Sequence, residues 1–455
     1  YAQQRHWFLW QLEPLSTAYH LSGGLRLTGR LDIEALRWSF AALGRRHESL
    51  RTVFRANAEG GAEQIIEDEP RLEIPLTDFS GLSLESARAQ AGEEAGRIAG
   101  SPFDLTQGPL LRLALIRIAP EEHLLVVVMH HIISDAWSNR IVIDEFAAHY
   151  RSRVQQEQEG EKQGQEFSLP ALPIQYADYA IWQRNWLEAG EKERQLAYWR
   201  SQLGEEHPVL QLPADHPRSS RASYRAARHT FTFPAGLVGR LQRQAQSQGA
   251  TLFMALLSGF QGLLYRYTGQ RDIRVGVPIA NRQRVEIENI VGFFVNTQVL
   301  RTLMDGRMSL KSVLDQTREA ALGAQTHQDL PFEQLVEALQ PERNLNQNPL
   351  FQVMYNHLRE DYRALEQLPG LTVEDHELSE QAAQFELTLD TVEQPDGRLE
   401  ATFTYAAELF EPATIARLGG HYLHLLEQLA EHPQQSLGEI DILSEAERAQ
   451  LKAWG

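Results

Sequence analysis

The residues best suited to chemistry lie in one short stretch, where His130 and His131 are followed closely by Asp135. An unbroken apolar run, residues 124–129, leads into this stretch, and a helical pattern of apolar residues follows it over 137–150. α/β proteins place their active sites at such junctions of strand end, polar loop and helix start. An imidazole with its ordinary pKa near 6.5 is mostly neutral at about pH 7, so it can accept a proton from an attacking amine. The stretch is therefore our candidate for acid–base chemistry.

Other interpretations of the same residues stay open. Asp135 stands where a helix N-cap is expected, and the two histidines can be the polar end of a strand. A metal site is disfavoured, because adjacent histidines are too close to chelate one ion comfortably and no further ligand follows at a metal-binding spacing. In an extended strand neighbouring side chains point to opposite faces, so only one of the two rings is expected to face a given cavity.

The elements that position this stretch are predicted from apolar periodicity. Residues 124–129 are continuously apolar, which is typical of a strand covered on both faces in the middle of a sheet. Asp32 is the expected N-cap of a helix over 33–46. In the first third of the chain we expect strands over 25–31, 109–118 and 123–129 and helices over 33–46, 82–99 and 137–150.

A polar segment, residues 154–167, is the best candidate for a linker, because it is rich in Gln, Glu, Lys and Gly and prolines follow it. We therefore divide the chain into an N-terminal lobe over 1–165 and a C-terminal lobe over 166–455. The second lobe repeats the mixed α/β character of the first. Its expected strands are 228–233, 273–277 and 293–300, and its expected helices are 251–267 and 412–429.

Composition excludes several classes of protein. The 455 residues are 42% hydrophobic and 23% charged, as in an ordinary globular protein, and the formal charge of −18 disfavours nucleic acid as a partner. The chain has no Cys, which excludes disulfides and thiolate chemistry and fits a cytoplasmic location. No apolar run approaches the roughly 20 residues of a membrane span, and no signal peptide begins the chain. The abrupt ends suggest a piece of something longer.

Seven segments resemble, in order, the motifs of the condensation domains of nonribosomal peptide synthetases. The segment 130–135 reads HHIISD and is similar to the family's HHxxxDG signature, with Ala136 where Gly is usual. Any one match is weak, but seven in the expected order are specific, and they cover nearly the whole chain. The segments are 2–14, 46–54, 130–135, 176–184, 290–297, 327–333 and 343–351.

The resemblance implies a fold and a reaction. The implied fold is α/β (α+β), with two chloramphenicol-acetyltransferase-like lobes in a V-shaped pseudo-dimer, the site at their junction, and a latch segment near 384–390. The implied reaction joins a donor aminoacyl or peptidyl thioester to the amine of an acceptor aminoacyl thioester. Phosphopantetheine arms of upstream and downstream carrier proteins present both substrates, next to an adenylation domain. No cofactor of the domain itself, no metal, no nucleic acid and no membrane are expected.

The resemblance also implies roles for single residues. His131 accepts or orients the amine proton, and the choice between a general base and a positioning group stays open. His130 is expected to be structural, and Asp135 to pair with a buried arginine, first Arg46 and second Arg282. The expected catalytic group is thus His131, His130, Asp135 and Arg46. The expected channel residues are Ser134, Ala136, Trp137, Asn296 and Arg282.

Alternatives remain within this family. The sequence does not separate a domain that joins two L-configured substrates from a dual domain that first epimerises the donor. A non-catalytic docking platform of the same fold is a second class, disfavoured because such platforms generally lose the signature histidine. A coenzyme A-dependent acetyltransferase is a third, disfavoured because such enzymes are about half as long. Substrate selectivity, the natural product and the flanking domains are not readable from one chain.

Overall fold

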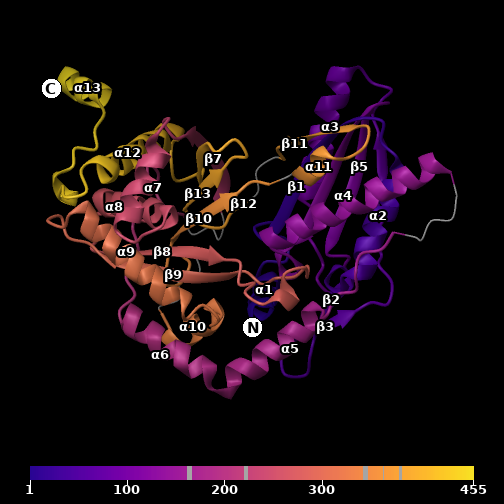
Figure 1. Cartoon of the computed structure of the whole chain (residues 1–455), viewed down its shortest axis with the longest axis horizontal. Helices are drawn as coiled ribbons and strands as arrows, with labels where there is room; N and C mark the ends of the chain where they lie inside the picture. The colour runs from indigo at the N-terminus through magenta and orange to yellow at the C-terminus, as the bar shows by residue number, and fades with distance from the viewer. Residues whose placement is uncertain (161–166, 220–223, 342–346, 362, 379–381) are drawn as a thin grey trace. The chain divides into compact units, whose positions relative to one another are not determined.

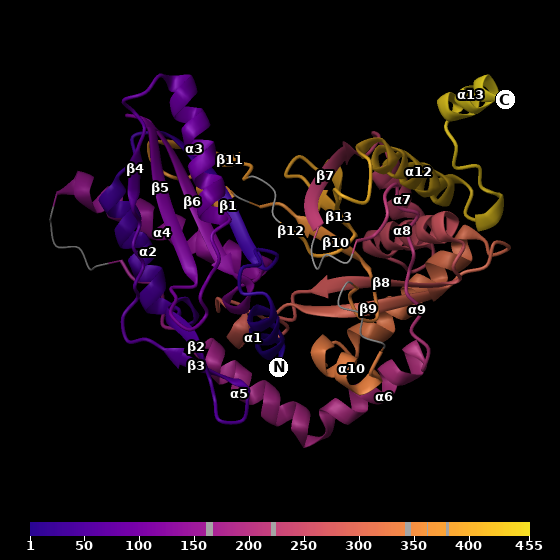
Figure 2. The ribbon, with the colours of Figure 1, turned by 180° about the vertical axis from the view of Figure 1, so that it is seen from behind.

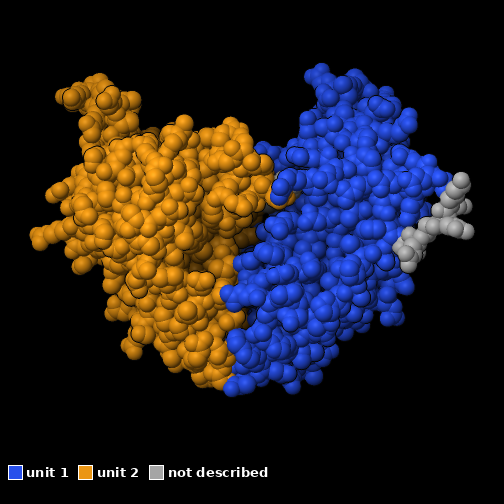
Figure 3. All heavy atoms as spheres, viewed as in Figure 1, with its two compact units in different colours: residues 1–189, 280–295, 362–381 blue, residues 190–279, 296–361, 382–455 orange. Residues whose placement is uncertain are grey.

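The chain folds into two compact units (Figure 3). The computed structural model describes residues 1–160, 167–219, 224–341, 347–361, 363–378 and 382–455. Unit 1 consists of residues 1–189, 280–295 and 362–381, and unit 2 of residues 190–279, 296–361 and 382–455. The boundary expected near residue 165 and the first part of the seventh motif, 343–346, lie outside the described residues.

Unit 1 is built on a five-stranded sheet of order β11-β1-β6-β5-β4, beside a small two-stranded sheet of β2 and β3 (Figures 1 and 2). Its strands are β1 (His20–Gly29), β2 (Thr52–Ala56), β3 (Ala62–Ile66), β4 (Leu76–Asp78), β5 (Leu111–Ala119), β6 (Glu122–His130) and β11 (Leu371–His376). Its helices are α1 (Ala2–Leu12), α2 (Ile33–Arg46), α3 (Leu84–Ala99), α4 (Ala136–Glu159), α5 (Tyr176–Trp186) and α11 (Arg363–Glu366).

The local signals of unit 1 act as predicted. β6 is the central strand, paired antiparallel with β1 on one side and β5 on the other, and a tight turn joins β5 to β6. α2 begins where its cap requires, because the Asp32 carboxylate accepts a hydrogen bond from the Ala35 amide at 2.9 Å. α3 packs on β5 and β6, and α2 packs on α4 through the stacked rings of Phe40 and Phe146, 4.7 Å apart.

Unit 2 holds a seven-stranded mixed sheet of order β12-β7-β14-β13-β10-β8-β9. Its strands are β7 (Tyr224–Thr232), β8 (Asp272–Ile279), β9 (Asn296–Leu303), β10 (Val353–Arg359), β12 (Ala382–Ala383), β13 (Leu387–Glu393) and β14 (Leu399–Ala406). Its helices are α6 (Lys192–Leu203), α7 (Leu237–Ser247), α8 (Leu252–Thr268), α9 (Leu310–Gln325), α10 (Phe332–Leu339), α12 (Pro412–Glu431) and α13 (Glu445–Trp454).

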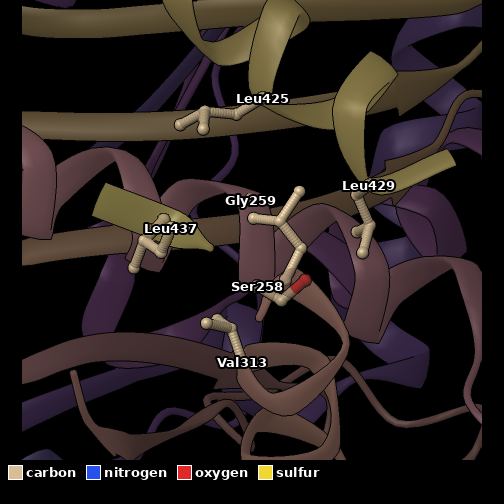
Figure 4. A pocket seen from close by; sticks show the side chains of 8 residues that line it. Ser258, Gly259, Val313, Leu425, Leu429 and Leu437 are labelled. Atoms are coloured by element: carbon tan, nitrogen blue, oxygen red, sulfur yellow. The ribbon is translucent and has the colours of Figure 1, made fainter. Parts of the chain in front are cut away.

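α8 is the centre of the core of unit 2. All residues over 254–264 are buried, and the helix contacts α7, α9, α12 and β8. A helix that is apolar on every side has to be surrounded in this way. Figure 4 shows a small apolar cavity beside α8, about 10 Å³ in volume and lined by Ser258, Gly259, Val313, Leu425 and Leu437 among others.

Three expectations differ from the structure. The predicted linker 154–167 is helical in its first part, because α4 continues to Glu159 through Gln, Glu and Arg residues that favour helices. The predicted strand 293–300 begins only at Asn296, because the amides before it bond to a carboxylate. The division into 1–165 and 166–455 does not coincide with the two units, because segments 280–295 and 362–381 join the first through hydrogen bonds and strand pairing.

Among the described residues, no helix combines the length and the apolar character needed to cross a membrane.

Candidate functional site

The loop after β6 is tightly turned. β6 ends at His130, residues His131–Ile133 form a 3₁₀ turn, and Asp135 caps α4. The Nδ1 atom of His130 accepts a hydrogen bond from the Ile132 amide at 3.0 Å, and the His131 amide donates to the Tyr19 carbonyl at 2.9 Å. The alternation expected for two adjacent strand residues therefore does not apply, because His131 belongs to the turn.

One hydrogen bond anchors the His131 imidazole at Nδ1. Its Nδ1 lies 2.8 Å from the Ser134 carbonyl oxygen, which only accepts, so Nδ1 carries the proton in this contact. The lone pair of the neutral ring is then on Nε2. Burial lowers the pKa of His131, although the Asp135 charge and the hydrogen bond to Ser134 raise it in part. A neutral ring with its acceptor atom opposite the protein contact can receive a hydrogen bond or a proton.

Two further aromatic rings contact His131. The His6 ring, from α1, stacks on it with centroids 5.5 Å apart and an interplanar angle of 21°. Phe293 meets the same ring edge to face at 4.9 Å. His6 and Phe293 also contact each other, with centroids 4.7 Å apart. Sequence reasoning missed both contacts, since no spacing relates position 6 or 293 to position 131.

His130 is held in a more enclosed environment than His131. Its side chain is buried, and it meets the rings of His20 and Phe103 edge to face at 6.0 Å. Burial, with smaller effects from His20 and His131, lowers the pKa of His130 to about 3. The ring is therefore neutral at physiological pH, and its Nδ1 is already used in the turn.

Asp135 is a buried carboxylate with four hydrogen bonds. Oδ1 accepts from the Ser138 amide at 2.8 Å and from Arg282 Nη2 at 3.0 Å. Oδ2 accepts from the amides of Phe294 and Val295 at 3.0 and 3.1 Å. A buried charge needs this degree of pairing to be tolerated. The carboxylate thus ties the start of α4 to the loop 280–295.

Arg282 is the partner of Asp135, and our first choice, Arg46, was wrong. Arg282 is buried, and its Nη1 also donates to the carbonyls of Ile287 and Ile290 at 3.0 and 2.5 Å. Its guanidinium lies 4.2 Å from the centre of the Phe294 ring. Burial lowers the pKa of Arg282, and the Asp135 charge opposes that shift. Arg282, our second choice of partner, thus makes a structural contact, and its expected role in the channel stays a prediction.

Arg46 serves a different carboxylate. It pairs with Glu145 of α4 and donates to the Pro170 carbonyl from Nε and Nη2 at 3.2 and 2.9 Å. The neighbouring His47 is completely buried, and its Nε2 lies 2.7 Å from Glu145 Oε2. Arg46 lies at the end of α2, so Glu145, on the α4 helix packed against α2, is the carboxylate within its reach. Neither arginine is the solvated surface residue that Arg most often is.

The fourth and fifth motifs meet in unit 1. Tyr176 donates from its hydroxyl to the Phe293 carbonyl at 2.7 Å, and a Cβ on Gly292 would lie 2.2 Å from the Tyr176 ring. Glycine at 292 is therefore required by close approach. Ser138 donates to the Gly292 carbonyl at 2.8 Å, and Trp137 donates from Nε1 to the Glu288 carbonyl at 2.9 Å. These bonds hold the loop 280–295 against the start of α4.

The remaining predicted channel residues lie in different settings. Ser134 is completely buried, and its carbonyl is the acceptor for His131. Ala136 is exposed and is the first residue of α4, a helical position that does not need glycine. Asn296, in unit 2, donates from its side-chain Nδ2 to the carbonyls of Gln328 and Leu330 at 3.0 and 2.8 Å, and its Oδ1 accepts from the Phe332 amide at 3.0 Å.

No group of three His, Asp or Glu side chains in the described part of the chain is placed to hold a metal ion. The site offers instead one oriented imidazole, a rigid loop around it and a well-satisfied carboxylate behind it. This arrangement can accept and orient a proton but holds no side chain placed as a covalent nucleophile among the contacts described above.

The chain is similar in sequence to a known family and to parts of longer proteins. A family model described as a condensation domain matches residues 1–452. The chain is 43% identical over 453 residues to one of the linear gramicidin synthase proteins of Brevibacillus parabrevis, a match that covers 99% of this chain and 9% of that protein. It is 39% identical over 450 residues to chondramide synthase cmdD of Chondromyces crocatus, covering 99% and 11%. The chain thus spans about a tenth of the length of these relatives.

Solved structures share the fold. The X-domain in its complex with OxyB from teicoplanin biosynthesis matches with a TM-score of 0.85 at 29% identity, covering 97% of this chain and 95% of that one. A four-domain nonribosomal peptide synthetase bound to AMP and glycine matches with a TM-score of 0.85 at 22% identity, covering 98% and 34%. The expected α+β fold class is confirmed by these structures.

Proposed function

The chain belongs to the condensation domain family, as its ordered motifs predicted, and we propose that it forms an amide bond between two carrier-bound thioesters. The donor is an aminoacyl or peptidyl thioester and the acceptor an aminoacyl thioester, so the activity is an acyl transfer. The observation that carries the proposal is the His131 imidazole, whose Nδ1 is tied to the Ser134 carbonyl. The similarity of the chain to a linear gramicidin synthase protein supports the same chemistry.

The proposed step moves one proton and one acyl group. The acceptor amine attacks the donor carbonyl carbon, the carbon–sulfur bond breaks, and the donor thiolate takes up the proton that the amine gives up. His131 Nε2 accepts a hydrogen bond or the proton itself from the amine, because burial lowers its pKa and keeps the ring neutral. A thioester is already reactive, so orientation of the two substrates supplies a large share of the acceleration.

The other predicted residues support His131 without touching the reacting atoms in this proposal. His130 closes the turn, and Asp135 with Arg282 fixes the loop that carries Phe293. Arg46 anchors α2 to α4 through Glu145. We propose upstream and downstream carrier proteins as partners, each presenting a phosphopantetheine arm, beside an adenylation domain in a longer synthetase. The length of the relatives supports such a multidomain context.

Two subtypes, an L-to-L domain and a dual epimerising domain, are consistent with the proposed function. A docking platform is the second candidate function, because the X-domain at 29% identity is seen in a complex with OxyB. The presence of His131 with a fixed tautomer favours a catalyst over a platform.

The test is product formation on the acceptor carrier, followed by intact-mass spectrometry. Donor carriers are loaded with an L- or a D-configured aminoacyl group and the acceptor with an L-aminoacyl group. We expect the wild-type chain to form the dipeptidyl product and His131→Ala to lose about a hundredfold in rate or more. His123→Ala, a change at a buried histidine of unit 1 at the start of β6, is the control and retains the rate.

Circular dichroism shows that each variant is folded before its rate is compared. If the wild-type chain makes no product from either donor but binds a carrier, the platform function takes the place of catalysis. If His131→Ala keeps the wild-type rate, His131 is not the group that handles the amine proton. The preferred donor isomer separates the two subtypes.

A further inference from the structure

His6 lies against the residue that we propose as the proton acceptor, although nothing in its sequence position suggests this. It comes from α1, and its ring is nearly parallel to that of His131, at 21° and 5.5 Å. Tyr19 and Phe293 pack against His6 edge to face at 4.9 and 4.7 Å. The His6 ring is therefore itself held in place and cannot turn freely.

His6 is a polar side chain that is buried among aromatic rings. The side chain is only 6% exposed, and its Nδ1 has no hydrogen-bond partner among the described residues. Burial, then the charges of His131, His130 and Arg5, lower the pKa of His6 well below its usual range. His6 is thus a neutral aromatic ring, and a buried nitrogen without a partner is unfavourable for stability. An apolar side chain of similar size would avoid that loss.

We propose that His6 is a positioning residue for condensation: its neutral ring packs on the face of His131 and fixes the plane in which Nε2 presents its lone pair. The proposal rests on the function proposed above for His131. It concerns only residues of unit 1, and the contacts that carry it join α1, the turn after β6 and the loop 280–295.

The hydrogen bond to Ser134 alone does not fix the His131 ring. The ring turns only about its side-chain bonds, and a single hydrogen bond at Nδ1 tolerates small rotations about the Cβ–Cγ bond. His6 stacks on one face of the His131 ring, and Phe293 contacts the same ring edge to face. Together with the hydrogen bond to Ser134, these two contacts restrict the rotation of the His131 ring. A small misplacement of a reacting group lowers rate strongly, so a fixed plane at Nε2 has a direct catalytic consequence.

The same contact favours the charged form that arises during reaction. When His131 takes the amine proton it becomes an imidazolium whose ring centre lies 5.5 Å from that of His6. An aromatic face within about 6 Å of a cation attracts it electrostatically. His6 remains neutral at this moment, because a second charge beside His131 is disfavoured.

The experiment compares His6→Ala, which removes the ring, with His6→Phe, which keeps an aromatic face and removes the nitrogens. We expect His6→Ala to lower kcat about tenfold while KM for both carriers stays within about twofold of wild type. We expect His6→Phe to restore kcat to within about threefold of wild type. His123→Phe is the matched control, since His123 is also buried with an unpartnered Nδ1 and lies at the far end of β6.

A second readout does not depend on activity. In the resting chain with ¹⁵N-labelled histidine, we expect His131 to show one tautomer, protonated at Nδ1, and His6→Ala to shift its two ring nitrogens toward averaged values. His6→Leu, which fills the space without an aromatic face, replaces His6→Ala if that variant does not fold.

Two results would overturn the proposal. One is a folded His6→Ala or His6→Leu with wild-type kcat and an unchanged His131 tautomer. The other is an equal loss of kcat in His6→Phe and His6→Ala, which would assign the effect to the nitrogens of His6. If the wild-type chain makes no product, condensation fails as its function, while the tautomer measurement still decides whether His6 holds the His131 ring.

Discussion

Unit 1 buries an ion pair beside its candidate site, whereas the centre of unit 2 is α8, an apolar helix buried along 254–264. In unit 1 the side chains of Arg282 and Asp135 are 1% and 3% exposed. Unit 2 also buries an arginine, Arg274, but its partner Asp272 is 19% exposed and lies at the start of β8. Both units have a large apolar core, and unit 1 adds a fully buried ion pair beside its candidate site.

The buried ion pair of unit 1 and the apolar helix α8 of unit 2 contribute differently to stability and to geometry. A buried ion pair is weak evidence for stability, because desolvation offsets most of the attraction, while apolar burial is the main favourable term in folding. We therefore infer that the ion pair of unit 1 sets geometry: the carboxylate of Asp135 accepts from four donors and ties the loop beside His131 to the start of α4. α8 and its neighbours in unit 2 contribute mainly stability.

The largest effect is expected from Arg282→Ala. It leaves the Asp135 charge buried without its partner, so we expect a loss of about 4 kcal/mol in the free energy of unfolding and no product formation. Urea titration and the mass-spectrometric assay measure the two effects. Arg240→Ala, at the exposed pair with Glu431, is the control and should cost less than about 1 kcal/mol. A stable and active Arg282→Ala would remove the geometric role of the pair.

Truncating a core leucine of unit 2 tests whether the apolar core contributes to stability without affecting the rate. Leu389 on β13 is completely buried in the core, so Leu389→Ala should cost about 3 kcal/mol by leaving a cavity. We expect the rate per folded molecule to stay within about twofold of wild type. A rate loss as deep as that of Arg282→Ala would show that the core of unit 2 also sets the geometry of the reaction.

The pH dependence of the free energy of unfolding tests whether buried His130 stays neutral in the folded chain. The pKa of His130 is about 3 in the folded chain and near 6.5 when unfolded, so only the unfolded state binds the proton between these values. The contribution of His130 to the free energy of unfolding should fall by roughly 1.4 kcal/mol per pH unit as the pH drops below 6.5. Above pH 6.5 this contribution should not change.

His130→Asn should remove that part of the slope, because its amide oxygen can accept the Ile132 hydrogen bond without titrating. Urea titrations at pH 7.0, 6.0 and 5.0 compare the two chains. Both chains keep the other buried histidines, so the difference between the slopes reports the effect of replacing His130. Identical slopes would mean that His130 charges in the folded state.

The smallest effect is expected at the cavity of unit 2. A Cβ on Gly262 would lie 3.2 Å from Leu437 Cδ1, and Leu437 itself borders the cavity and has room to give. Gly262→Ala should therefore stabilise by about 0.5–1 kcal/mol through the gain in helix propensity. Gly259→Ala is the matched contrast, because its Cβ would lie 2.5 Å from Leu426 Cδ2. We expect this substitution to destabilise the folded chain. Thermal unfolding distinguishes the two, and a destabilised Gly262→Ala would show that Leu437 cannot move.

Much of the local structure was predictable from the sequence. The helix 33–46 was predicted at its observed ends, because both a cap and the apolar period mark it. The central position of 123–129 followed from its unbroken apolar run. Local signals of this kind act within a few residues, and that is the range over which the predictions were accurate.

The site was predictable only in part. The position of the polar loop and the cap at Asp135 followed from local pattern, but its arginine partner did not. Arg46 and Arg282 are both remote from Asp135 in sequence, and only the path of loop 280–295 brings Arg282 near. The stacking of His6 on His131 has the same origin, since contacts 125 positions apart depend on how α1 packs.

The strand β11 has a consequence for how the chain is made. β1 pairs on one side with β6 and on the other with β11, which begins 371 − 29 = 342 residues after β1 ends. At about 5–20 residues per second, a ribosome needs roughly 17–70 s to deliver that partner. During this interval one edge of β1 remains open to unwanted pairing by other nascent chains. Because residues 190–279 and 296–361 of unit 2 lie between β1 and β11 in the sequence, unit 1 cannot be exchanged as one continuous piece without them.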